Sequence, residues 1–384
     1  MIQEYNKKGE KGGIMAQKKI TFSVIKADIG SIGGHTKPSN EQIQKVQKII
    51  QAQVGKLIYD CFVSYTGDDI AILMPHGRGI NNPEVHKLAW DAFKEGTEVA
   101  KKQGLYAAGQ DLLKDAFSGN VKGMGPAVAE IELKKRQSEP FMVFAADKTS
   151  PGAYSLPLYS IFCEPSKSSG LLLAKDVNKG FKFTIMDVSH AEKDKVIELE
   201  TPKDLHEIAI LLRDNERFVV ESVHSLAYPE EQVVSVSTTR LHNIAGTYTG
   251  KDDPVMIVRV QKQFPATEEV VHPFHLGHYV GGDARGSHIM PLMPVPINSP
   301  VDFIYCCPIV SCLAFSISDE GKLTEPVDLF AGYGWEYVRS QVAAKAIEMR
   351  RQGFSGPAML PESELEYGWL REKLADLEKK FRFR

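Results

Sequence analysis

Strand-like and helix-like segments alternate along almost the whole sequence, and this mixture limits the possible folds more than any other feature. Apolar and β-branched runs between turn residues predict strands at 20–27, 57–65, 70–74, 141–146, 181–188, 218–223, 233–238 and 255–260. Helical periodicity covers residues 39–50, 85–102, 341–351 and 363–381. Since no internal repeat or long linker divides the chain, the sequence predicts one α+β or α/β unit with several antiparallel strand pairs.

Short cap and turn signals delimit several of these segments. Ser39 stands where it can cap the N-terminus of the first predicted helix. Asn82-Pro83 is a favourable helix start, because proline is tolerated at the first helical position. Gly67-Asp68-Asp69 predicts a tight turn, so the strands on either side of it are expected to form a hairpin.

The composition excludes several classes of protein. The 384 residues are 43% hydrophobic with a formal net charge of -3, so a large core can form and no strong field favours nucleic acid or an anionic membrane surface. No apolar run approaches the roughly 20 residues that a membrane-spanning helix needs. The five cysteines are odd in number and contain no C-x-x-C pair, which disfavours a disulfide framework or a zinc site and favours the reducing cytoplasm.

The first 18 residues differ from the rest of the chain. They are polar, rich in Gly and Lys, and lack the apolar segment of a signal peptide. We expect residues 1–18 to form a disordered N-terminal tail, with Met15 as an alternative start, and residues 19–384 to form the folded domain.

Acidic residues recur at the ends of strand-like runs, each in a short turn. These residues are Asp28, Asp68, Asp69, Asp147, Asp252 and Asp253. Strand ends gather residues from distant parts of a chain into one crevice, and carboxylates gathered there repel one another unless cations neutralise them. Magnesium and calcium prefer such oxygen ligands, and two or more ions can assist the cleavage of a phosphate ester. The alternative for any single Asp is a turn residue that bonds its own backbone.

Two further segments contain candidate site residues. His35 lies in the Gly-rich loop after Asp28 and could bind a metal or a phosphate, and Gln110 offers a neutral oxygen ligand. Lys251 adjoins two carboxylates and follows Tyr248 by three residues. A Lys near metal cations has a lowered pKa and can form a Schiff base with a ketone, with the Tyr transferring the proton. The alternative is a Lys paired with its neighbouring aspartates in a surface turn.

Motifs of three rival enzyme classes are incomplete. The string G-x-x-x-G-K-D at 246–252 is one residue too short for a phosphate-binding P-loop and lacks its Ser or Thr. Gly332-Tyr333-Gly334 lacks the third glycine of a dinucleotide-binding fingerprint. The sequence lacks the G-x-S-x-G elbow that is typical of a serine hydrolase.

Several long strings resemble one family. In chain order, these strings are VIKADIGSIGGH, GDD, LYAAGQDLLKDAFSGNVKGMGP, EPFMVFAADKTSPGAYSLPLY, GKDDPVMIVR and GGDARGSH. Together they resemble the bifunctional fructose-1,6-bisphosphate aldolase/phosphatases of archaea and deeply branching bacteria. The resemblance runs from about Lys18 to the C-terminal helices. It implies a gluconeogenic enzyme that joins dihydroxyacetone phosphate and glyceraldehyde 3-phosphate, and then hydrolyses the product to fructose 6-phosphate.

The resemblance also implies a role for particular residues. It implies several magnesium ions per subunit, held by Asp28, His35, Asp68, Asp69, Gln110, Asp147, Lys251, Asp252 and Asp253. It implies a Schiff base on Lys251 and proton transfer by Tyr248. Contacts with sugar and phosphate are implied for His35, Tyr106, Gly119, Asn120, Lys148, Gln261, Arg285 and Tyr367. The implied fold is a single-domain four-layer α-β-β-α sandwich, assembled as a homo-octamer.

One position departs from the family pattern. Tyr305-Cys306-Cys307 stands where a turn with a substrate-contacting Asp is expected, and a Tyr hydroxyl can bond a sugar but cannot act as a carboxylate. Two alternatives therefore stand beside the bifunctional enzyme. One is a magnesium-dependent phosphatase without aldolase activity, and the other is a non-catalytic homologue that binds sugar phosphates.

Overall fold

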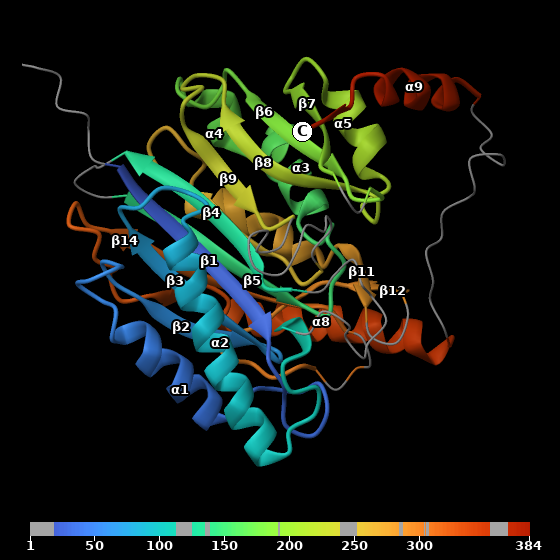
Figure 1. Cartoon of the computed structure of the whole chain (residues 1–384). Helices are drawn as coiled ribbons and strands as arrows, with labels where there is room; N and C mark the ends of the chain where they lie inside the picture. The colour runs from blue at the N-terminus through green and yellow to red at the C-terminus, as the bar shows by residue number, and fades with distance from the viewer. Residues whose placement is uncertain are drawn as a thin grey trace, which may run out of the picture.

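The computed structural model shows a mixed α/β protein with two large sheets (Figure 1). It describes residues 19–112, 125–134, 139–190, 193–238, 252–283, 287–302, 304, 307–353 and 368–384. None of the helices in these ranges is both long enough and apolar enough to cross a bilayer.

The first sheet has four antiparallel strands in the order β2-β3-β1-β4. Their bounds are β1 Lys19–Asp28, β2 Phe62–Thr66, β3 Asp69–His76 and β4 Ala127–Lys134. Helices α1 (Asn40–Gln51) and α2 (Pro83–Gln103) pack on one face of this sheet. Ile25 and Ala27 of β1 meet these helices, while Phe22 and Val24 point to the other face, so both faces of β1 are buried.

The second sheet has ten strands and continues the antiparallel pattern over most of its width. Its order is β13-β14-β5-β10-β9-β8-β6-β7-β16, with β15 paired to β14. The bounds are β5 Glu139–Asp147, β6 Phe181–Asp187, β7 Lys195–Glu200, β8 Phe218–Ser225, β9 Gln232–Val236, β10 Val255–Arg259, β13 Met293–Pro294, β14 Ile309–Ile317, β15 Val327–Asp328 and β16 Arg382–Phe383.

The two sheets pack face to face through β5, whose side chains alternate between two cores. Phe141 and Val143 meet Phe22 of the first sheet, and the Phe141 ring stacks on Phe315 at 5.6 Å between centroids. Met142 and Phe144 point the opposite way into the largest core. Helices α3 (Ser155–Cys163), α5 (Leu205–Leu212) and α8 (Tyr333–Arg351) contribute to that core.

Smaller elements join these layers. They are η1 Gln110–Leu112, η2 Pro165–Lys167, α4 Ser169–Leu173, α7 Thr267–Val271, η3 His272–Leu276 and the hairpin of β11 Tyr279–Asp283 and β12 Ser287–Pro291. Helix α9 (Gly368–Glu378) lies beside α5 and far from α8 (Figure 1). Lys373 of α9 pairs with Glu207 of α5 at 2.5 Å.

Local cap and turn predictions are confirmed where the chain is described. Ser39 caps α1 through a reciprocal pair of hydrogen bonds with Gln42, and the Asn82 side chain caps α2. Strands β2 and β3 form the expected hairpin, with Thr66 opposite Asp69.

Two element boundaries are wrong in the sequence prediction. Residues 57–61 are not strand, because Leu57 and Ile58 donate hydrogen bonds to the Gln53 carbonyl in the turn that ends α1. Helix α8 begins at Tyr333 rather than 341, because Trp335 and Val338 extend its buried face by two turns. The predicted N-terminal tail (1–18) lies outside the described residues.

Candidate metal centre and comparisons with known proteins

Two groups of acidic and His side chains meet where the two sheets end. Asp28, His35 and Asp68 form the first group, and Asp69, Asp147 and Asp253 form the second. Within each group, one ligand atom from every residue lies within 4.8 Å of the others. Five of the six Asp residues that were predicted to converge from strand ends therefore lie in these groups.

Strand pairing explains why the two groups adjoin. Asp28 ends β1 directly opposite Asp69, the first residue of β3. Asp147 ends β5 in the second sheet, and Asp253 lies two residues before β10, the neighbour of β5. The turn at Gly67 passes so close to Asp147 that a Cβ there would lie 1.5 Å from Asp147 Oδ2, so only glycine fits.

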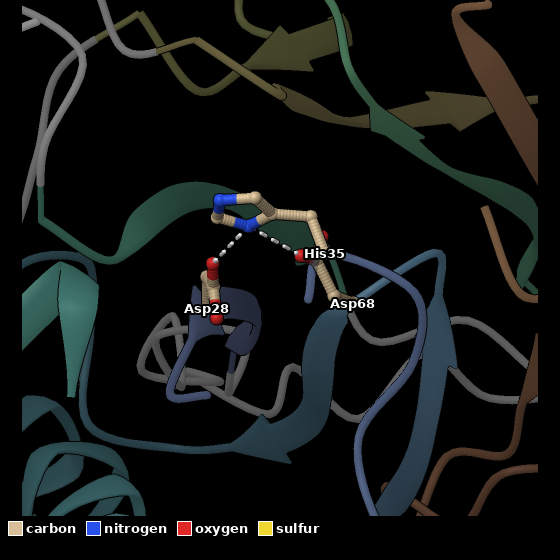
Figure 2. Close-up of side chains that lie close together, drawn as sticks. All are labelled: Asp28, His35 and Asp68. Carbon is tan, nitrogen blue, oxygen red and sulfur yellow. Dashed lines mark hydrogen bonds and ion pairs between the residues drawn. The ribbon is translucent and has the colours of Figure 1, made fainter. Parts of the chain in front are cut away.

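The first group centres on His35 (Figure 2). Its Nδ1 lies 3.0 Å from Asp68 Oδ2 and 3.8 Å from Asp28 Oδ2, and the ring meets Tyr106 edge-on at 5.0 Å. Asp28 accepts a hydrogen bond from the backbone of Gly30 at 2.9 Å. Burial and the neighbouring carboxylates raise the pKa of Asp28 well above its usual value.

Two buried ammonium groups partly neutralise the carboxylates. Lys26, on β1, is 1% exposed and forms an ion pair with Asp69. Lys148 Nζ lies 2.5 Å from Asp68 Oδ1 and 2.8 Å from Asp147 Oδ1, and so bridges the two groups. Although burial raises the pKa of Asp68, Lys148 and His35 hold it well below its usual value.

Negative charge remains in excess at the second group. Burial raises the pKa of Asp69 to about 7, that of Asp147 to about 8 and that of Asp253 to about 7. Carboxylates with raised pKa values in a crowded site are those that a divalent cation stabilises. Oxygen ligands with a single imidazole suit a hard cation, so the residues present fit a metal centre.

Other predicted site residues lie at different distances from the two groups. Asp252 is partly buried beside Asp253, and Gln110 begins η1 next to Asp111, which accepts a hydrogen bond from the backbone N–H of Asp28 at 2.9 Å. Gln261 follows the far end of β10 and bonds Thr267 at 3.1 Å, so this chain does not bring it to the carboxylates.

The remaining predicted residues cannot be placed. The ones that lie outside the described residues are Lys251, Tyr248, Gly119, Asn120, Arg285, Tyr367 and Tyr305. Their roles remain predictions.

Sequence reasoning missed two polar residues of the centre. Lys26 occupies a position in β1 where an exposed polar residue would fit the alternation equally well, and no motif marks it. Asp111 orients the backbone at Asp28 from a distant segment. β1 alternates apolar and polar residues, so its sequence gives no signal that Lys26 is buried.

We predict that the chelator-treated protein loses stability as the pH rises from about 4 to about 8. The buried carboxylates have folded pKa values above the unfolded value of about 3.9, so between these pH values the folded state binds more protons than the unfolded state. Stability therefore falls with rising pH until the folded carboxylates have ionised. Thermal unfolding should show a fall in Tm of a few degrees. Saturating magnesium should remove most of the slope, since bound cations stabilise the ionised carboxylates. A flat profile in chelator would contradict the prediction.

Comparison with known proteins agrees with the resemblance noted in the sequence. A family model described as fructose-1,6-bisphosphatase matches residues 19–382. The chain is 58% identical over 363 residues to the fructose-1,6-bisphosphate aldolase/phosphatase of Thermus thermophilus, covering 94% of this chain and 99% of that protein. The proteins of the same name from Cenarchaeum symbiosum and Methanocaldococcus jannaschii are 51% and 42% identical, covering 91% and 96% of this chain and 91% and 93% of theirs. The chain belongs to the fructose-1,6-bisphosphatase family.

Proposed function

We propose that this protein is a bifunctional fructose-1,6-bisphosphate aldolase/phosphatase that acts in gluconeogenesis. The observation that carries the proposal is the pair of adjoining acidic groups bridged by Lys148, in a chain that matches this family over nearly its whole length. The relatives compared above all have that name and exceed 40% identity.

The hydrolytic half uses the metal centre. Magnesium would be held by Asp28, His35, Asp68, Asp69, Asp147 and Asp253, with Asp252 and Gln110 as further ligands. When bound, it supplies positive charge that stabilises phosphoryl oxygens during cleavage of the C1 phosphate ester. Lys148 adds a fixed positive charge: burial lowers its pKa, but Asp147 and Asp68 raise it well above the usual value, so the amine stays protonated and can bind phosphate.

The aldolase half uses the segment directly before Asp252. The Lys251 amine would attack the ketone of dihydroxyacetone phosphate and lose water to form an iminium ion, which accepts the electrons left when C3 is deprotonated. Tyr248 would transfer the protons at C3 and at the aldehyde oxygen. The location of Asp253 in the second acidic group supports this assignment, because Lys251 precedes it by two residues in the sequence.

The remaining features follow from the same family. We propose that residues 19–384 form one four-layer α-β-β-α domain, supported by α1 and α2 outside the first sheet and by the helices that pack on the far side of the second. We propose a cytoplasmic homo-octamer, which light scattering of the purified protein tests.

One assay distinguishes the bifunctional enzyme from both alternatives. Purified protein is given triose phosphates and magnesium, and fructose 6-phosphate and inorganic phosphate are followed together. We expect equal amounts of both products, loss of both after chelation, and recovery with magnesium. Hydrolysis of added fructose-1,6-bisphosphate without synthesis from trioses would indicate a phosphatase alone, and full activity after chelation would contradict the metal centre.

A further inference from the structure

The loop between α5 and β8 directs a carboxylate toward the β11–β12 hairpin. Glu216 Oε1 is inaccessible to solvent and makes no hydrogen bond of good geometry to another described residue, and the same is true of Ser150 Oγ. Burial raises the pKa of Glu216, against a smaller opposing effect of the Ser150 hydroxyl. Burying a polar group without a good partner costs stability, so its retention here calls for an explanation.

Both neighbours of Glu216 are fixed in place. The carbonyl oxygen of Asn215 lies close to Gly152: a Cβ at position 152 would be 1.7 Å from this oxygen. On the other side, Arg217 Nη2 donates to Asp187 Oδ2 at 2.7 Å. These separate contacts fix the chain on either side of Glu216.

The Glu216 carboxylate lies against the backbone of Gly281 in β11. A Cβ at Gly281 would lie 1.7 Å from Glu216 Oε1 and 2.8 Å from Ser150 Oγ. The φ angle of Gly281 lies outside the left-handed region, so close approach rather than backbone conformation requires the glycine. Ser150 N–H donates to the Gly281 carbonyl at 2.7 Å, and Val280 anchors the same strand in the core.

Ser150 connects this contact to the carboxylate groups. Two residues before it, Lys148 bridges Asp68 and Asp147. Thr149 N–H donates to Asp253 Oδ1 at 2.7 Å, and Asp253 N–H donates to the Thr149 carbonyl at 3.1 Å. The segment 148–150 therefore lies between the metal centre on one side and Glu216 with β11 on the other.

We propose that Glu216 is a positioning residue for substrate binding: its carboxylate packs against Gly281 beside Ser150 and so sets the spacing between the β11–β12 hairpin and Lys148. This inference rests on the proposed function, in which Lys148 binds a phosphate of the sugar bisphosphate. The metal carboxylates receive their own backbone hydrogen bonds, from Asp68, Lys148 and Thr149, none of which involves Glu216.

Substitutions at Glu216 separate positioning from general stability. Glu216→Ala should raise the KM for fructose-1,6-bisphosphate about tenfold, with kcat and the magnesium concentration for half-activation nearly unchanged. Glu216→Gln keeps the shape and an acceptor oxygen, and should restore most of the affinity. Arg213→Ala changes an exposed residue of the same loop and should behave as the unchanged protein.

A double substitution tests the contact itself. Gly281→Ala should raise the KM strongly, because the new methyl group collides with the Glu216 carboxylate. Removing that carboxylate relieves the closest collision and leaves only the contact with Ser150 Oγ at 2.8 Å. Glu216→Ala combined with Gly281→Ala should therefore have a lower KM than Gly281→Ala alone. Additive effects, or a fall in Tm at Glu216→Ala without a change in KM, would overturn the proposal.

Calorimetric measurement of fructose-1,6-bisphosphate binding tests the proposed enzymatic function and the positioning role of Glu216 separately. If the unchanged protein binds the sugar but neither makes nor hydrolyses it, the proposed function fails, and the Glu216 variants still report on positioning through their affinity. If the unchanged protein is active and Glu216→Ala binds the sugar equally well, the positioning role alone is refuted.

Discussion

Replacing Asp147 with Asn is expected to lower kcat/KM for fructose-1,6-bisphosphate hydrolysis by about a thousandfold or more. Asp147 is fully buried at the junction of both acidic groups, where it accepts hydrogen bonds from Asp68 N–H at 3.1 Å and from Lys148 Nζ at 2.8 Å. An Asn side chain has nearly the same shape but lacks the negative charge. In one of its two orientations it also turns an amide N–H toward the Lys148 ammonium, which cannot accept a hydrogen bond.

The same variant should lose metal as well as activity. Magnesium retained per subunit after gel filtration is the second measurement, and it should fall together with hydrolysis. Asp328→Asn is a matched control, since Asp328 also accepts two backbone hydrogen bonds, from Ile297 and Phe330, but lies at β15 away from the acidic groups. We expect the control to keep normal activity. Activity of Asp147→Asn within tenfold of the unchanged protein would contradict the assignment.

Asp147 also illustrates what the sequence predicts well. A carboxylate at the end of an apolar run, repeated at several such ends, predicts a shared site because strand ends of adjoining sheets meet. The register confirms this most directly at Asp28 and Asp69, which lie opposite each other although 41 positions separate them. Local signals such as the Ser39 cap depend on a few adjacent residues, and these are also confirmed.

Features that depend on distant contacts were not predictable in the same way. Strand β5 pairs with β14 and β10, and nothing in residues 139–147 specifies those partners or the order of ten strands. Lys26 has the sequence context of an exposed strand residue, and only the burial of both faces of β1 makes it an internal cation. Glu216 is one of many acidic loop residues until the fold brings Gly281 against it.

The largest effect on synthesis is expected at Tyr248, where Tyr248→Phe should separate the two activities. Aldol condensation requires proton transfer at C3 of dihydroxyacetone phosphate and at the aldehyde oxygen, and Tyr248 is the proposed acid and base for both. Its loss should lower synthesis from trioses by about a hundredfold to ten-thousandfold. Hydrolysis of added fructose-1,6-bisphosphate needs neither proton transfer, so it should remain within about threefold of normal. Tyr228→Phe, which removes a hydroxyl bonded to Asp176 at 2.9 Å, should affect neither activity.

Lys251 should separate the activities less cleanly. Only an amine of this kind forms the iminium ion, so Lys251→Arg should lose the borohydride-trapped adduct with dihydroxyacetone phosphate, and synthesis with it. The amine is also adjacent to Asp252 and Asp253, and once released from the ketone it can bind a phosphate or support the metal ligands. Hydrolysis by this variant should therefore fall by an amount that depends on magnesium concentration. Peptide mapping of the trapped adduct decides the assignment: label on a lysine other than Lys251, or equal loss of both activities in Tyr248→Phe, would refute this division of roles.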